Sequence, residues 1–406
     1  MTSKTVTHAA TQGSSALTLL FAVICALAVA TVYFAQPLLD TMAVSLGVTP
    51  AMIGIVVTVT QVGYAAGLLF IVPLGDLLNR KAMVLGQLLL SAAALVAASM
   101  AQHWWALLGA MGVVGLMAVV VQVLVAYAAV LAPPHRRGQA VGTVTSGVVI
   151  GILLARLVSG SVADLAGWRT VYLMAAGLML AMTGIVWRAV PGTAEPRTGQ
   201  GYTALLRSMF ALYATEPVLR RRGVFAMLIF AAFSVLWTAM VLPLSAPPLS
   251  LSHAHIGLFG LAGIAGALAA ARAGRWADEG KGSRTTGFAL ALLVVSWLPI
   301  GLAHSSLLAL ALGVAMLDFA VQAVHVTNQS LILAARPDAQ SRMVGAYMCC
   351  YSAGSGLGAV AATQAYAHGG WLAVCLLGAG ISAVAWCVWW LDRATGTVAP
   401  SPSFKE

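Results

Sequence analysis

One carboxylate lies deep inside an apolar stretch of the sequence, and the side chains that share its helical face are polar. Asp318 lies about thirteen residues into the run 305–334, which at about 1.5 Å per residue is roughly 20 Å from the start of the run. Gln322, His325 and Gln329 follow it at spacings of four, three and four, so all four side chains lie on one stripe of a helix. A polar stripe at this depth predicts a cavity inside a membrane protein.

Asp318 and His325 are the members of this stripe that could move a proton. A buried carboxyl group could take up a proton and release it again on contact with water. An imidazole titrates near neutrality, so His325 could share that proton or donate it to a substrate. The alternatives are a static ion pair or a helix-locking hydrogen bond for Asp318, and a neutral histidine satisfied by its helix or a neighbour for His325.

Arg156 is a second charged residue at membrane depth, in the run 140–163. It could form an ion pair with Asp318, bind an anionic substrate through its planar guanidinium group, or pack within its own half of the protein. Weaker candidates for the same cavity are polar or aromatic residues in other apolar runs: Tyr33, Gln36, Gln61, Gln122 and Trp237. Of these, Trp237 could stack on an aromatic ligand.

The elements that must position these residues are membrane helices. The chain has 406 residues, of which 61% are hydrophobic and 8% charged, and its mean hydropathy is +0.94. A soluble domain has about 25% charged residues, so a water-soluble globular protein is excluded. Each spanning helix needs about 20 apolar residues, and such runs lie at 16–39, 51–74, 82–101, 104–131, 140–163, 169–190, 223–247, 255–274, 285–303, 305–334, 343–366 and 371–391. The sequence predicts an all-α integral membrane protein with twelve transmembrane helices in two bundles of six.

The positive charges predict the orientation, because Lys and Arg are retained on the cytoplasmic side. All but two of the 21 Lys and Arg residues fall on the side of the N-terminus; Arg169 falls on the other side and Arg156 within the membrane. Both termini are therefore expected in the cytoplasm, in a multi-pass protein of the inner (plasma) membrane. The net charge of +10 does not indicate nucleic acid, because the basic residues form short clusters between apolar runs. The turns that hold His253, His255 and His304 then face outward, and we interpret these histidines as solvated.

The longest connection separates the two bundles and contains helical spacings. Residues 191–222 begin as a solvated linker and continue with Tyr202, Leu205, Leu206, Met209, Phe210 and Tyr213 on one face, which predicts an interfacial amphipathic helix. A loop packed on the ends of the bundle is the alternative. The predicted organisation is a cytoplasmic tail (1–15), an N-terminal bundle (16–190), this linker (191–222), a C-terminal bundle (223–391) and a second cytoplasmic tail (392–406).

The two halves of the chain repeat each other. The landmarks recur at an offset of 202 or 203 residues: Asp76 and Asp278, Pro134 and Pro337, Val141-Gly142 and Val344-Gly345, Gly167-Trp168 and Gly370-Trp371. This offset carries the second helix onto the eighth and the fourth onto the tenth, an even shift. The halves therefore have the same orientation in the membrane and are parallel repeats.

The loop 73–81 carries a resemblance to a known family. It reads Pro-Leu-Gly-Asp-Leu-Leu-Asn-Arg-Lys and is similar to the Gly-x-x-x-Asp-Arg-x-Gly-Arg-Arg/Lys signature of the major facilitator superfamily. Across essentially its whole length the chain resembles this family, and most of all its twelve-helix bacterial efflux permeases of the drug:proton antiporter type. The resemblance implies the family's fold and a cytoplasmic gating latch formed by Asp76, Arg80 and Asp278. A plain positive-inside anchor is the alternative for this loop.

Two helices depart from the antiporter pattern. Gly147 and Gly151 match the first half of the group's Gly-x-x-x-Gly-Pro-x-x-Gly-Gly motif, but Ile152 stands where the motif has Pro. The fourth run has neutral Gln122 as its main polar residue, where the group usually has an arginine.

These patterns predict a secondary active transporter that works by alternating access. We expect proton-coupled efflux (antiport) of a small amphipathic molecule, drug or metabolite; the alternative is proton-coupled uptake or facilitated transport of a small organic acid or sugar. The expected partners are the substrate, protons and the lipid bilayer, with no nucleic acid, cofactor or metal, in a monomer. An enzyme is not expected because the acidic residues are scattered, and an ATP-driven pump is not expected because Gly280-Lys281 lacks the rest of a phosphate-binding loop.

Overall fold

The computed structural model describes residues 2–131, 137–191, 201–264, 282–336 and 340–394, and these residues form helices without any strand. The helices, in chain order, are α1 (Thr2–Tyr33), η1 (Gln36–Leu38), α2 (Leu39–Leu46), α3 (Ile55–Phe70), η2 (Val72–Asp76), α4 (Arg80–Met100), α5 (Trp104–Ala118), α6 (Val120–Leu131), α7 (Arg137–Ala166), α8 (Trp168–Ala189), α9 (Tyr202–Thr215), α10 (Pro217–Ala239), α11 (Val241–Ser245), α12 (His253–Leu258), η4 (Phe259–Ala262), α14 (Gly282–Gly301), α15 (Leu307–Ala335) and α16 (Gln340–Ala394).

Ten stretches of the described chain are long and apolar enough to cross a membrane. The last of them, Arg342–Ala394, has 53 residues, and as one straight helix it would be about 80 Å long against a hydrocarbon core of about 30 Å. It breaks at Gly369 and Gly370, whose backbone is not helical, so it folds back as two helices. Much of the predicted run 255–274 lies outside the described residues. The count of twelve and the cytoplasmic side of the termini therefore remain predictions.

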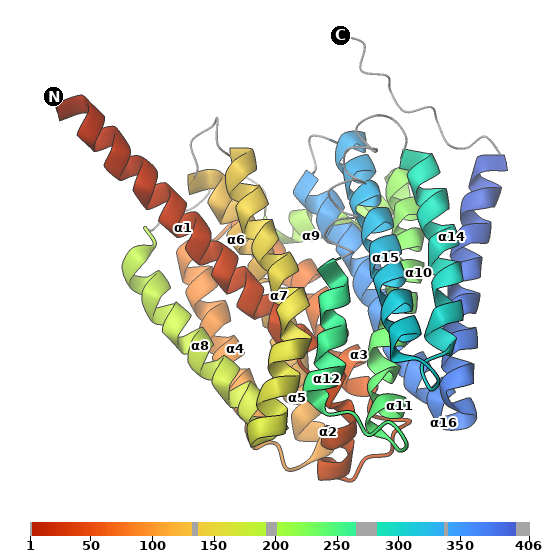
Figure 1. Cartoon of the computed structure of the whole chain (residues 1–406). Coiled ribbons are helices and arrows are strands. Elements are labelled where there is room, and N and C mark those ends of the chain that lie inside the picture. The colour runs from red at the N-terminus through yellow and green to blue at the C-terminus, as the bar shows by residue number, and fades with distance from the viewer. Residues whose placement is uncertain (1, 132–136, 192–200, 265–281, 337–339, 395–406) are drawn as a thin grey trace.

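The helices form two bundles that lie side by side (Figure 1). The N-terminal bundle consists of α1 to α8, and the C-terminal bundle consists of α10 to α16. α1 begins and α16 ends at the same end of the molecule, which we call the terminal end. The other end, where α2 lies and α12 begins, is called the opposite end.

Glycines allow helices of each bundle to pack with their backbones in contact. A Cβ atom built on Gly147 of α7 would lie 2.1 Å from the carbonyl oxygen of Ala22 in α1. In the C-terminal bundle, a Cβ atom on Gly354 of α16 would lie 2.0 Å from the carbonyl oxygen of Met227 in α10. The first and fifth spans of each half therefore pack in the same way, as expected for two repeats.

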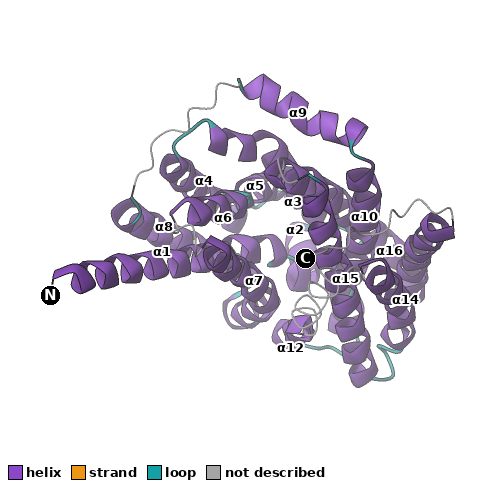
Figure 2. Cartoon of the chain, turned by 90° about the horizontal axis from the view of Figure 1, so that it is seen from above, coloured by secondary structure: helices purple, strands orange, loops and turns teal. Residues whose placement is uncertain are grey.

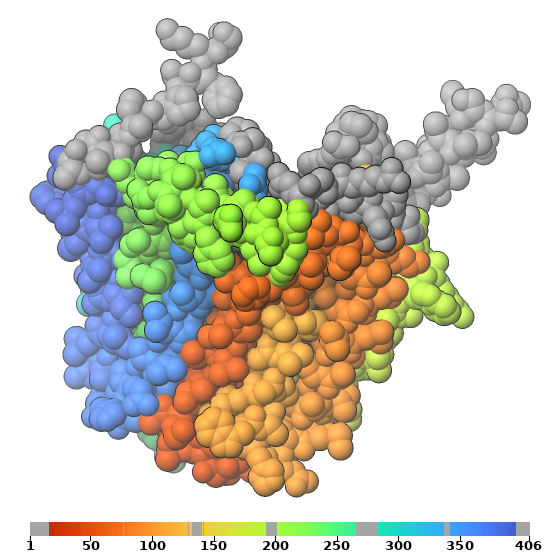
Figure 3. Space-filling model, turned by 180° about the vertical axis from the view of Figure 1, so that it is seen from behind, coloured from red at the N-terminus to blue at the C-terminus, as the bar shows by residue number. Residues whose placement is uncertain are grey.

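α9 lies along one edge of the molecule near the terminal end and contacts both bundles (Figures 2 and 3). The Tyr202 hydroxyl donates a hydrogen bond to the carbonyl oxygen of Phe70 in α3, at 2.8 Å. The Tyr213 hydroxyl donates one to the carbonyl oxygen of Ala346 in α16. A helix is thus present where the linker was predicted to form one, and part of its apolar face is buried; its place at a membrane interface remains a prediction.

The bundles contact each other mainly toward the opposite end, where α3 packs on α16 and α7 packs on α12. The Thr58 hydroxyl donates a hydrogen bond to the carbonyl oxygen of Gly356, at 2.6 Å. The Thr363 hydroxyl donates one to the carbonyl oxygen of Ala51, at 3.0 Å, in the connection between α2 and α3. The described structure is therefore closed at this end.

Candidate functional site

Arg156 of α7 lies buried where the two bundles meet, with 2% of its surface exposed. Its Nε donates a hydrogen bond to Oε1 of Gln36, at 2.8 Å. The guanidinium carbon lies 3.6 Å from the ring centroid of Trp237 and 5.2 Å from that of Tyr33. Aromatic faces attract a cation most strongly when water is excluded, so these rings contribute to stabilising the charge.

Trp237 of α10 connects Arg156 to the membrane carboxylate. The face of its indole ring contacts the guanidinium group, and its Nε1 donates a hydrogen bond to Oδ1 of Asp318 in α15, at 3.2 Å. Asp318 is 4% exposed. Among the described residues no direct ion pair joins Arg156 to Asp318. Arg156 and Asp318, which were predicted to lie near one cavity, thus each contact the indole ring of Trp237 and do not contact each other.

One donor of Arg156 has no partner. Its Nη2 atom is buried and makes no hydrogen bond, although a buried donor without a partner costs free energy. A small cavity adjoins the side chain and is lined by Gln36, Pro37, Arg156, Trp237, Met240, Val241 and Ile256. It has room for about one water molecule. The site therefore retains an unused hydrogen-bond donor on a permanent positive charge.

A series of glycines brings the C-terminal bundle close to Arg156. A Cβ atom on Gly257 of α12 would lie 2.5 Å from the Arg156 carbonyl oxygen, and one on Gly260 would lie 3.4 Å from the Arg156 Cβ atom. A Cβ atom on Gly263 would lie 3.4 Å from Oδ2 of Asp318. These glycines recur every third residue, which is a helical spacing. This spacing of glycines in the sequence is a signal for a close approach between the halves, and it was not among the predictions.

His325 lies among aromatic side chains and makes no contact with Asp318 among the described residues. Its Nδ1 atom is 3.0 Å from the Tyr347 hydroxyl, and its ring meets that of Phe230 edge to face at 5.1 Å. Nearby, the Tyr33 and Tyr351 hydroxyls form a hydrogen bond of 2.6 Å between the bundles. The Tyr347 hydroxyl therefore supplies His325 with the hydrogen-bond partner that a neutral, structural histidine would have.

Of the other predicted cavity residues, Gln122 is joined to the aromatic side chains through Tyr64, whose ring lies 6.4 Å from that of Tyr351. Nε2 of Gln122 donates to the Tyr64 hydroxyl at 3.5 Å, and Oε1 of Gln61 is buried without a partner. Gln322 and Gln329 are partly buried on α15. Their contact with a substrate remains a prediction.

Of the three predicted gating residues, the two whose backbone is described lie at the terminal end. Asp76 is the last residue of η2, and Arg80 is the first residue of α4. The described structure covers the backbone but not the side chain of Asp76, and Asp278 lies outside the described residues. The gating role therefore remains a prediction.

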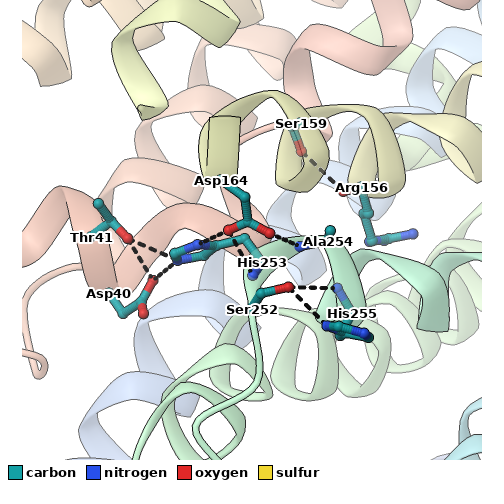
Figure 4. A network of polar contacts seen from close by, with 9 residues as sticks. All are labelled: Asp40, Thr41, Arg156, Ser159, Asp164, Ser252, His253, Ala254 and His255. Atoms are coloured by element: carbon teal, nitrogen blue, oxygen red, sulfur yellow. Dashed lines mark hydrogen bonds and ion pairs between the residues drawn. The ribbon is translucent and has the colours of Figure 1, made fainter. Parts of the chain in front are cut away.

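A second polar cluster lies at the opposite end and was not predicted (Figure 4). His253, at the start of α12, lies between Asp40 of α2 and Asp164 of α7. The hydrogen bond with Asp40, supported by Asp164, raises the pKa of His253 above its ordinary value of 6.5. The interpretation as a solvated loop histidine is wrong for His253, whose side chain is 19% exposed, whereas His255 and His304 are exposed.

Comparisons with known proteins agree on one family. The sequence model of the Major Facilitator Superfamily matches residues 19–286 and 223–406. The uncharacterized transporter YgaY of Escherichia coli O157:H7 is 46% identical over 377 residues, which are 93% of this chain and 95% of that protein. The multidrug resistance protein MdtG of Serratia proteamaculans is 33% identical over 127 residues, or 31% of each chain. A bacterial homolog of the human lysosomal transporter Spinster, in an inward-facing and unoccupied conformation, has a TM-score of 0.76 at 15% identity over 96% of this chain and 99% of that one.

Proposed function

Because this chain belongs to the Major Facilitator Superfamily, we propose that it exports a small amphipathic molecule, drug or metabolite in exchange for protons. The observation that carries this proposal is the buried cluster of Arg156, Trp237 and Asp318, which joins the two bundles at one indole ring. A transporter that rocks its bundles against each other must rearrange this cluster in every cycle. We place the protein in the inner (plasma) membrane as a monomer, with both termini in the cytoplasm.

Asp318 is the proposed proton-coupling residue. Its carboxylate is buried and accepts the indole hydrogen bond, and no Lys or Arg contacts it directly among the described residues. The indole bond is compatible with both protonation states, because a neutral carboxyl group keeps an acceptor oxygen. A proton can therefore enter and leave without breaking the contact that positions the side chain.

The direction of transport rests on similarity. Over essentially its whole length the chain resembles efflux permeases of the antiporter type, and part of it is similar to a protein named for multidrug resistance. Both observations favour export of a drug or metabolite as the first candidate.

The unpartnered Nη2 atom of Arg156 favours a second candidate, the proton-coupled uptake of a small organic acid. A guanidinium group can hold a carboxylate through two parallel hydrogen bonds, and here one donor is unused. Facilitated transport of an organic acid, or transport of a sugar, belongs to the same alternative.

Transport by purified protein in liposomes tests the proposal and separates the two candidates. A pH-sensitive dye reports the luminal pH while cationic drugs, organic acids and sugars are added outside in turn. Exchange predicts that the lumen becomes more alkaline when the transported ligand enters, because protons leave. Uptake with protons predicts a more acidic lumen. Ligand entry without any change beyond that in protein-free liposomes would contradict proton coupling.

Replacing Arg156 with Lys tests the second candidate. Lysine keeps the charge but loses the planar fork and the stacking. If Arg156 binds a carboxylate, we expect the affinity for organic acids to fall about tenfold, which corresponds to the loss of one charge-assisted hydrogen bond. Initial uptake rates at several ligand concentrations measure this change. An unchanged affinity for the transported acid would show that Arg156 does not bind it. Arg169→Lys, at the opposite end, is the matched control.

A further inference from the structure

His253 touches a carboxylate with each of its two ring nitrogens. Its Nε2 atom lies 3.1 Å from Oδ1 of Asp40, and its Nδ1 atom lies 2.9 Å from Oδ1 of Asp164 (Figure 4). A neutral imidazole has one N–H group and can donate to one of these carboxylates, whereas an imidazolium ion donates to both. The observed geometry therefore fits the protonated ring.

The charges around His253 favour the same state. The charged or titratable groups described on the elements that contact it are Asp40 on α2, Asp164 and the more distant Arg156 on α7, and His255 on α12 itself. Within the described residues His255 bonds to Ser252 of its own segment alone, and the Thr41 hydroxyl, 2.8 Å from Nε2 of His253, is neutral. Two adjacent carboxylates and no adjacent cation among these residues stabilise a positive charge on the ring.

The same contacts hold the two bundles together. Asp40 and Asp164 belong to the N-terminal bundle, and His253 belongs to the C-terminal bundle. The Asp164 carboxylate also accepts the backbone N–H groups of His253, at 3.0 Å, and of Ala254, at 2.7 Å. A Cβ atom on Gly160 would lie 2.2 Å from the His253 carbonyl oxygen, so the backbones touch at this point. Opening the opposite end must break this cluster.

We propose that His253 is a second proton-binding site, and that a proton bound there holds the opposite end of the transporter closed. The proposal rests on the alternating access proposed above. In the open state His253 separates from Asp40 and Asp164 and titrates as an ordinary imidazole. In the closed state, hydrogen bonds to Asp40 and Asp164 raise the pKa of His253 above 6.5. Protonation of His253 therefore stabilises the closed state to its full extent below about pH 6.5. This stabilisation is lost as the pH rises through the raised pKa.

This site would give protons a role before they reach the centre of the protein. In an exporter, protons arriving at the opposite end would close it after the substrate has left. The central cluster would then be accessible from the terminal end, ready for the next substrate. His253 would thus couple the external pH to the direction in which the binding site faces.

Distances between spin labels test the proposal without any ligand. The five native cysteines are replaced, and labels are attached at Val44→Cys of α2 and Leu258→Cys of α12, where the native side chains are 85% and 46% exposed. In the unliganded protein in lipid nanodiscs, we expect one short distance at about pH 5.5 and a second, longer distance at about pH 8.5. The ratio of closed to open populations is expected to fall about fivefold or more over this interval.

His253→Gln should abolish this pH dependence, since glutamine cannot take up a proton. His255→Gln is the matched control on the same helix, and it should behave as the wild type does. Asp164→Asn, which removes one of the two carboxylates, should shift the transition toward lower pH and provides a second test if His253→Gln fails to fold. A distance distribution that does not change with pH in the wild type, or that changes equally in His253→Gln, would overturn the proposal. Because the readout is a distance, absence of proton-coupled transport would instead overturn the proposed function.

Discussion

Asparagine in place of Asp318 is expected to abolish ligand-driven proton movement in liposomes while the protein still folds. The substitution keeps the shape of the side chain, and its amide oxygen can accept the indole hydrogen bond that Trp237 donates at 3.2 Å. It removes the group that binds and releases a proton. Accumulation of ligand against its gradient, measured with radiolabelled ligand under an imposed pH gradient, should fall to the level of protein-free liposomes.

A second measurement separates loss of coupling from loss of the protein's integrity. Exchange of labelled for unlabelled ligand at equal pH needs no net proton movement, so Asp318→Asn should retain it. Glu216→Gln makes the same chemical change outside the cluster, at a carboxylate paired with Arg336 near the terminal end, and should leave transport coupled. Normal gradient-driven accumulation by Asp318→Asn would show that Asp318 is structural.

Alanine in place of Gly354 is expected to destabilise the C-terminal bundle by about 3 kcal/mol, the upper end of the usual range for overpacking. The added Cβ atom would lie 2.0 Å from the carbonyl oxygen of Met227 and 2.7 Å from its Cα atom. These are backbone atoms, so α10 and α16 can relieve the overlap only by moving apart. The apparent melting temperature in detergent and the monodisperse fraction in size-exclusion chromatography should both fall sharply.

Gly177→Ala is the control for this prediction. Gly177 lies within α8, also a predicted membrane span, and a Cβ atom there would meet nothing within 4 Å. Alanine has the higher helix propensity by roughly 1 kcal/mol, so this variant should be as stable as the wild type or slightly more stable. A lower melting temperature for Gly354→Ala and an unchanged or higher one for Gly177→Ala would establish that the close contact at Gly354 causes the destabilisation. Equal changes in melting temperature would contradict this explanation.

The helical membrane fold and the family were predictable from the sequence because both depend on patterns that a chain displays locally. Apolar runs of membrane length, the repeat at 203 residues and the loop 73–81 are legible without coordinates. The break of α16 at Gly369 and Gly370 falls between the predicted runs 343–366 and 371–391. The count of helices stays a prediction because much of the predicted run 255–274 lies outside the described residues.

The contacts of the site were harder to predict because they join segments far apart in the chain. Helical spacing placed Asp318 and His325 on one stripe, but it could not show that each has its own partner, Trp237 for the carboxylate and Tyr347 for the imidazole. Depth in the membrane likewise brought Arg156 and Asp318 near each other without revealing the indole ring between them. Periodicity specifies the face of a helix, whereas partners depend on how the helices pack.

The cluster around His253 shows the same limit at the surface. His253 is separated from Asp164 by 89 residues and from Asp40 by 213, and nothing near any of the three residues indicates the others. A histidine in a short turn is usually solvated. Here the close approach of Gly160 to His253 places the ring between two carboxylates, and the outcome depends on that backbone contact.

α9 also has a mechanical consequence at the terminal end. This helix has 14 residues, so it is a stiff rod about 21 Å long. Tyr202 anchors it to the N-terminal bundle and Tyr213 anchors it to the C-terminal bundle. While both anchors hold, the rod limits how far the two bundles can separate, and each anchor yields at a cost of roughly 1 kcal/mol. α9 therefore braces the two bundles against further separation at the terminal end, by about the combined strength of these two hydrogen bonds.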